Sequence, residues 1–200
     1  MKKFLLLFSA ILSIASCTEN NDYKTDEDPQ PEPQPIQTIY EVGDLYNTDG
    51  IKGIVFRVDE GGKSGLIASL TEPESMLAWG QEFIETGSTI KTSGEQNTAI
   101  IYTLPNWKQK YPAFVWCKSL GSGWYIPAID ELQELITVSK SEKFVNNLKS
   151  VNATPFATTG NYLSSTEMDQ WWVYLVNAAN ATQSANYKQY TYNVRAIHTF

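Results

Sequence analysis

The stretch GWYIPAIDELQELI, residues 123–136, decides the fold more than any other part of this sequence. Pro127 suits the first turn of a helix, and the carboxylates of Asp130 and Glu131 favour the positive end of the helix dipole. Glu131 and Glu134 share one side, which we expect to be solvated. The other side is predicted to face a core, because its apolar residues recur at helical spacing: Ile129, Leu132, Leu135 and Ile136.

A β-hairpin is predicted well before this helix. Residues 51–58 alternate in the manner of a strand, and residues 66–70 form a second apolar run. The glycine-rich segment 59–65 between them is typical of a turn.

The C-terminal part of the chain also favours strands. Residues 171–176 are apolar on both faces, so we expect them to form a central strand. The other strand candidates are residues 162–166, 184–187 and 190–200.

Three further helices are predicted from apolar spacing. Residues 96–104 form one candidate, which Pro105 ends. A second begins near Pro112 and stops at a glycine pair near residue 121, and Ser141 is placed to cap a short third helix.

The first residues have the pattern of an export signal. Lys2 and Lys3 precede an apolar run, residues 4–15, that is shorter than the roughly 20 residues a membrane-spanning helix needs. The run ends in Ile-Ala-Ser before Cys17, which resembles the lipobox of bacterial lipoproteins. This resemblance implies a signal peptide at residues 1–16 and a lipid on Cys17, whereas the alternative is an ordinary secretory signal with an incidental cysteine.

Residues 17–37 predict a tether. Their acidic side chains far outnumber the single cation Lys24, and alternating prolines from Pro29 to Pro35 favour an extended polyproline II segment. An acidic stretch after the lipidated cysteine is similar to the export signals of surface-exposed lipoproteins, although a simple solvated linker explains the composition equally well. The expected location is the outer membrane, exposed at the cell surface. Residues 38–200 then have the length of one globular domain.

Charge and residue content exclude several classes of function. The chain has a formal net charge of −7 and shows no basic cluster, so nucleic acid is not an expected partner. With Cys17 assigned to the lipid, Cys117 remains alone, which excludes an internal disulfide and favours a buried, inert thiol. The single histidine, His198, gives little support to a zinc site or a catalytic triad. No catalytic residue, metal site or cofactor is therefore expected.

Taken together, these segments resemble the C-type-lectin-like domain at the C-terminus of bacterial collagen-like adhesins. The resemblance covers residues 42–200 and rests on GIVFRV at 53–58, GLIASL at 65–70, GWYIPAIDEL at 123–132, YLSSTE at 162–167 and YNVRAI at 192–197. It implies a mixed α+β domain with two main helices beside a twisted, mostly antiparallel sheet, with chain ends close together and binding loops on one side. The sequence lacks the Glu-Pro-Asn and Trp-Asn-Asp motifs that hold calcium and sugar in the best-known lectins.

The expected function is a surface lipoprotein, held to the membrane by the lipid on Cys17, that binds an extracellular glycan or protein without catalysis. The alternative is a structural or accessory subunit of a surface filament or outer-membrane complex. Aromatic rings stack on sugar faces, and asparagine and tyrosine make adaptable polar contacts. For each candidate contact residue, the competing interpretation is a place in the core or on an incidental part of the surface. The candidates are Asn161, Tyr162, Asp169, Gln170, Trp171, Asn180, Tyr187 and Tyr190.

Overall fold

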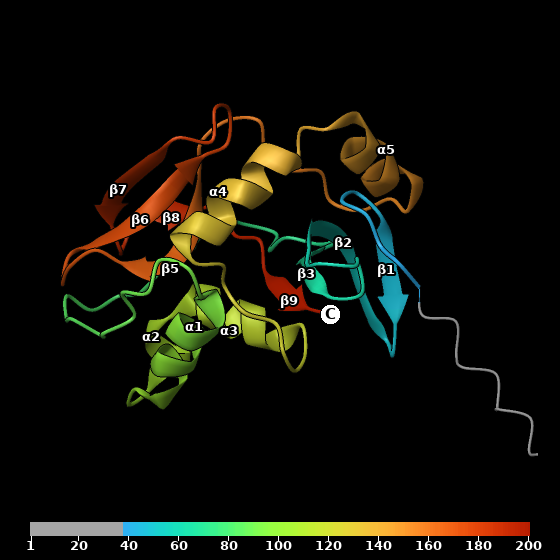
Figure 1. The fold of residues 1–200 in the computed structure, drawn as a ribbon. Coiled ribbons are helices and arrows are strands. Elements are labelled where there is room, and N and C mark those ends of the chain that lie inside the picture. Colours follow the sequence, from blue (N-terminus) through green and yellow to red (C-terminus); the bar gives the residue numbers. More distant parts are fainter. Residues whose placement is uncertain (1–37) are drawn as a thin grey trace, which may run out of the picture. The chain divides into compact units, whose positions relative to one another are not determined.

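The computed structural model describes residues 38–200. The predicted signal peptide (residues 1–16), the lipidation site Cys17 and the tether (residues 17–37) lie outside the described residues. The described part is an α+β structure in which helices accompany three antiparallel sheets, in agreement with the predicted class (Figure 1).

The predicted hairpin forms the centre of a four-stranded sheet. The strand order is β1-β2-β3-β9, with the bounds Leu45–Thr48, Ile51–Val58, Gly65–Ser69 and Ile197–Thr199. Both faces of β2 are covered: Ile54 and Phe56 belong to one hydrophobic cluster and Val55 to another. The rings of Tyr40 and Phe200 lie 5.3 Å apart, so the two ends of the domain are close, as the resemblance implies.

A three-stranded sheet carries the C-terminal half. Its order is β5-β6-β7, with the bounds Asn161–Glu167, Trp172–Asn177 and Gln183–Tyr187. The strand predicted to be central, β6, is the middle strand, which confirms that prediction. Two short strands, β4 (Leu77–Ala78) and β8 (Thr191–Tyr192), form a separate pair.

Five helices occur among residues 38–200, where the resemblance implies two main ones. Their bounds are Gly94–Thr103 for α1, Trp107–Lys110 for α2, Pro112–Ser119 for α3, Ile129–Val138 for α4 and Glu142–Ser150 for α5. The sequence predicted all of these except α2, whose single turn is too short to show an apolar stripe. None of the helices in the described region is long and apolar enough to cross a membrane.

Helix α4 packs between the two larger sheets, as Figure 1 shows. The four apolar residues predicted to face the core are all buried, because they contact strands of both sheets. The prediction that Glu131 is solvated is wrong, since its carboxylate is buried and accepts hydrogen bonds from the backbone of Gly94 at 2.9 Å and of Ala128 at 2.8 Å. Glu134 is half-exposed and forms an ion pair with Arg57.

The continuous strand predicted over residues 190–200 is interrupted. The chain leaves β8, bridges β5 through Asn193 and then joins β3 as β9, so it passes from one sheet to another. Arg195 is fully buried at this crossing and forms an ion pair with Glu72 at 2.6 Å. Because the segment changes partners, both alternating faces become buried and a single ladder cannot run through it.

Candidate functional site

The predicted contact residues divide between the two ends of the β5–β7 sheet. The register pairs Trp172 with Tyr187 at one end and Asn161 with Asn177 at the other. Five residues along β6 separate these ends by roughly 16 Å at the usual rise per residue. Five candidates therefore gather at the first end, namely Asp169, Gln170, Trp171, Tyr187 and Tyr190, while Asn161 and Asn180 lie near the second.

Tyr162 is a core residue and is not available as a surface contact. Its side chain is fully buried in the hydrophobic cluster under α4. The hydroxyl donates to Glu72 Oε1 at 2.6 Å and accepts a hydrogen bond from the Ala157 amide at 2.7 Å. The hydroxyl makes both of these hydrogen bonds within the protein, so we remove Tyr162 from the candidate contacts.

Large apolar side chains are exposed at the first end of the sheet. We call this surface the aromatic edge and define it by Phe83, Met168, Trp171, Tyr187 and Tyr190. Trp171 is 41% exposed, Met168 is 50% exposed and Tyr190 is 56% exposed. Exposed apolar side chains that gather on one surface are typical of an interaction site, whereas single ones are not informative.

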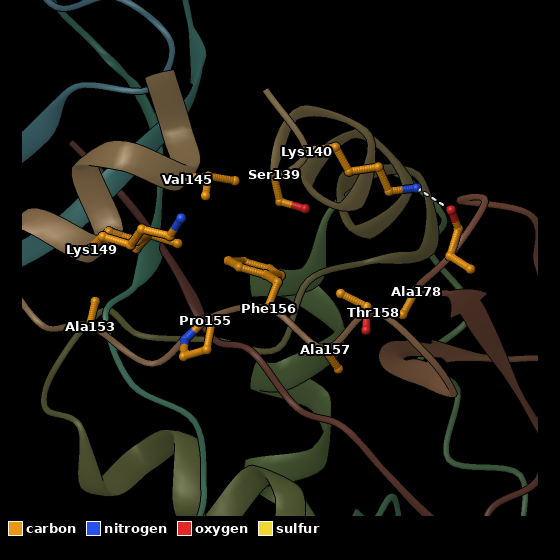
Figure 2. Close-up of a pocket in the computed structure, with 12 residues that line it drawn as sticks. Ser139, Lys140, Val145, Lys149, Ala153, Pro155, Phe156, Ala157, Thr158 and Ala178 are labelled. Atoms are coloured by element: carbon orange, nitrogen blue, oxygen red, sulfur yellow. Dashed lines mark hydrogen bonds between the residues drawn. The ribbon is translucent and has the colours of Figure 1, made fainter. Parts of the chain in front are cut away.

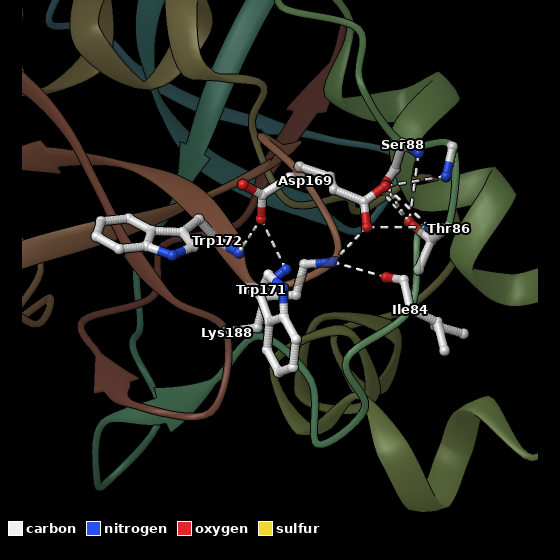
Figure 3. Close-up of polar contacts among 9 residues, drawn as sticks. Ile84, Thr86, Ser88, Asp169, Trp171, Trp172 and Lys188 are labelled. Carbon is white, nitrogen blue, oxygen red and sulfur yellow. Dashed lines mark hydrogen bonds and ion pairs between the residues drawn. The ribbon is translucent and has the colours of Figure 1, made fainter.

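The aromatic edge consists of two ring groups. In one, Phe83 lies against Trp171 with ring centroids 4.4 Å apart. In the other, Tyr187 lies between Trp172 at 5.2 Å and Tyr190 at 5.5 Å. Figure 3 shows Trp171 and Trp172 pointing in different directions from the same turn. The rings are thus held by one another rather than projecting singly into solvent.

Asp169 fixes the turn that presents the two tryptophans. Its Oδ1 accepts hydrogen bonds from the Trp171 amide at 2.7 Å and the Trp172 amide at 2.8 Å (Figure 3). Aspartate commonly closes a turn in this way, by binding the backbone two residues further on. The role of Asp169 is therefore structural, because its side chain orders the turn on which Trp171 sits.

A buried ion pair lies beneath the aromatic edge. Lys188 Nζ contacts Glu167 Oε1, and the two side chains are 0% and 1% exposed. Lys188 Nζ also donates to the carbonyl of Ile84 at 2.9 Å and lies 4.8 Å from the centre of the Trp79 ring. Burial lowers the pKa of Lys188, and its hydrogen bond to Glu167 acts in the opposite direction.

The same carboxylate holds the long loop between β4 and α1. Glu167 accepts hydrogen bonds from the amides of Thr86 and Gly87, at 2.9 and 3.0 Å (Figure 3). Phe83 belongs to this loop, so the buried pair positions one of the rings of the aromatic edge. The surface is built on fixed backbone rather than on a loop held only by its ends.

Sequence reasoning missed Phe83, Met168 and Lys188. Phe83 lies far from the aromatic C-terminal segment in sequence, and its loop is held at the edge by Glu167 and by the bond from Lys188 to the Ile84 carbonyl. A lysine between tyrosines predicts an exposed cation, whereas Lys188 is buried. The tyrosines around Lys188 are the signal for this surface that the sequence offers, and they lie at the end of the sheet where the aromatic edge forms.

The described residues do not form a metal site. No group of three or more His, Cys, Asp or Glu side chains within residues 38–200 is arranged to hold an ion. Glu72 and Glu167, two carboxylates near the C-terminal sheet, are bound to Arg195 and Lys188. Cys117 is buried as predicted, and burial raises the pKa of its thiol.

Comparison with known proteins gives a likeness of fold. No protein-family model matches the chain, and no curated protein sequence matches it. A fimbrial protein from Bacteroides ovatus has a similar crystal structure, with a TM-score of 0.56 and 20% sequence identity. The match covers 80% of this chain and 49% of that protein, so the chain spans about half the length of its structural neighbour.

Proposed function

We propose that this protein is a surface-anchored binding module, in which a C-type-lectin-like domain contacts an extracellular glycan or protein through the aromatic edge. The observation that carries the proposal is the joint exposure of Trp171, Tyr187 and Tyr190 at one end of the sheet. Trp171 sits on a turn ordered by Asp169, and the buried Glu167–Lys188 pair lies beneath this surface. Rigid aromatic residues supply contact area at low cost in conformational entropy. The proposal assigns binding without catalysis, metal or cofactor, and no nucleic-acid partner.

The proposed setting follows from the N-terminal sequence. A lipid on Cys17 would hold the chain in the outer membrane, and the tether at residues 17–37 would keep the domain clear of the bilayer. Polyproline II spans about 3.1 Å per residue, so the tether can extend by several nanometres. Metabolic labelling with a radioactive fatty acid tests this setting: label is expected on the wild type and absent from Cys17→Ala.

The binding proposal is tested with residues 18–200, the chain without its predicted signal peptide and Cys17. Binding is measured on a glycan array and by pull-down of surface proteins, with calcium and with a chelator. Trp171→Ala and Tyr190→Ala are each expected to weaken binding about tenfold or more, which is the usual loss for a buried aromatic anchor. Binding is expected to survive chelation.

The matched control is Val151→Ser, which removes an exposed apolar side chain outside the aromatic edge. It is expected to leave binding unchanged. Melting temperatures of all variants separate loss of contact from loss of fold. Full binding by Trp171→Ala and Tyr190→Ala would contradict the assignment of the aromatic edge.

A second candidate function is a subunit of a surface filament. The fimbrial neighbour favours it, and so do two sheet edges: among the described residues, β7 pairs only with β6 and β1 only with β2. Exposed strand edges are templates for pairing with another chain. Sedimentation and electron microscopy of residues 18–200 test for self-association, which Ser184→Lys on the β7 edge is expected to abolish. A strictly monomeric wild type would argue against this candidate.

A further inference from the structure

A recess of about 550 Å³ lies at the opposite end of the β5–β7 sheet from the aromatic edge. It is enclosed by the end of α4, by α5, by the segment that follows α5 and by the turn after β6 (Figure 2). Its size falls within the usual range for small-molecule sites. No residue of the aromatic edge lines it.

The walls of the recess are mainly apolar. Val145 and Leu148 contribute from α5, Ala178 from the turn after β6 and Phe156 from the segment between α5 and β5. In Figure 2 the Phe156 ring lies at the centre of the lining side chains. An apolar lining of this kind binds the apolar body of a ligand by removing it from water.

The Phe156 ring is held from behind by three neighbours. The Arg195 guanidinium lies 4.0 Å from its centre, and the rings of Phe144 and Tyr162 each lie 5.7 Å away. Arg195 and Tyr162 are themselves fully buried. The floor of the recess is therefore formed before any ligand arrives, which lowers the entropy lost on binding.

The charges at the recess are of one sign. Two lysines line it, Lys140 and Lys149, and no Asp or Glu residue is among the lining residues. Lys140 Nζ donates one hydrogen bond to the Ala179 carbonyl at 2.8 Å, which leaves two of its three donors for a ligand. Lys149 makes no side-chain hydrogen bond or ion pair with residues 38–200. The lysines are thus placed to receive an anion beside an apolar surface.

We infer that this recess binds a small amphiphile: an apolar body that packs on Phe156 and Val145, with one anionic group beside Lys140 or Lys149. The anionic group is a carboxylate, sulfonate or similar oxyanion, which lysine binds as a point charge. This site is separate from the aromatic edge and does not depend on the proposed function.

Two matched dyes test the inference on residues 18–200. 1-Anilinonaphthalene-8-sulfonate carries the apolar body and the anion, and N-phenyl-1-naphthylamine carries nearly the same body without charge. The wild type is expected to bind the sulfonate dye more tightly than the neutral dye. In Lys140→Gln/Lys149→Gln the affinity for the sulfonate should fall about fivefold, the size expected for two exposed charge contacts, while affinity for the neutral dye changes less than twofold.

Val145→Trp provides the steric test, because Val145 lies on α5 at the wall and is only half-buried. It should abolish binding of both dyes. Trp171→Ala/Tyr190→Ala is the matched control and should leave both affinities unchanged, since those rings are in the aromatic edge. Lys149→Glu changes an exposed side chain and leaves the core intact. It should weaken binding of the sulfonate dye and leave binding of the neutral dye unchanged.

Three results would overturn the inference. The first is no binding of either dye to the wild type. The second is dye binding that the aromatic-edge control abolishes and Val145→Trp leaves intact. The third is equal affinity for the two dyes that is insensitive to Lys140→Gln/Lys149→Gln. None of these results bears on ligand binding at the aromatic edge, which is measured separately.

Discussion

Tyr111 has a buried hydroxyl that forms no hydrogen bond with the described residues. Its ring is well placed, with edge-on contacts to Trp79 at 5.5 Å and Phe114 at 6.3 Å. Because a buried polar group without a partner costs about 1–3 kcal/mol, Tyr111→Phe should remove that cost and keep the packing. We expect the free energy of unfolding to rise by about 1 kcal/mol, measured by urea denaturation.

Tyr162→Phe is the matched control for this residue-scale prediction. Tyr162 is equally buried, but its hydroxyl binds both Glu72 and the Ala157 amide. Loss of that hydroxyl should lower the free energy of unfolding by about 1–3 kcal/mol, since two partners lose their hydrogen bond. The same sign of change in both variants would contradict the explanation.

At the scale of elements, the Glu167–Lys188 pair joins the ends of β5 and β7 to the loop that precedes α1. Lys188→Met should leave the Glu167 carboxylate buried beside the loop amides without its cation. Removal of one partner of a buried ion pair typically costs about 3–5 kcal/mol. We expect a loss of stability of that size, together with faster amide hydrogen exchange at Thr86 and Gly87.

A double-mutant cycle separates the pair from its surroundings. Lys188→Met/Glu167→Gln removes both charges, so its loss of stability should be clearly smaller than the sum of the two single losses. The glutamine oxygen can still accept from the Thr86 and Gly87 amides, and exchange at those amides should slow again. Additive losses would mean that the two side chains act independently.

At the scale of the whole molecule, five tyrosines, four of them buried and Tyr102 partly buried, make stability depend on alkaline pH. Burial raises the pKa of each above the ordinary phenol value of about 10, and to about 12 for Tyr111 and Tyr192. The folded state then keeps protons that the unfolded state releases, so this stabilisation is complete below pH 10 and is lost as pH rises toward 12. The five are Tyr102, Tyr111, Tyr125, Tyr162 and Tyr192.

The expected measurement is a steady fall in the free energy of unfolding between pH 10 and pH 11.5, with a smaller slope in Tyr111→Phe. Burial lowers the pKa of Lys188, so this residue makes the free energy of unfolding rise with pH, opposite to the tyrosines. A net fall is still expected, because five tyrosines act against this one lysine. A free energy of unfolding that stays constant over this range would contradict the burial of these phenols.

Elements with strong local periodicity were predictable from the sequence. Helix α4 shows its apolar stripe over about two turns, and the hairpin of β2 and β3 shows two apolar runs around glycines. The central place of β6 followed from its two apolar faces. The segment 190–200 also alternates like a strand, but its residues pair with strands of two different sheets. Alternation in the sequence does not show which strand a residue will pair with.

By itself, therefore, the sequence determined the α+β class, the positions of four of the five helices and the aromatic character of the end of β6 and β7. Only the tertiary structure decided which candidates share a surface, because strand register places Trp171 and Tyr187 at one end of the sheet and Asn161 at the other. It also decided that Glu131 and Lys188 are buried. Burial of a charge depends on partners far away in sequence, and these partners meet only when the chain has folded.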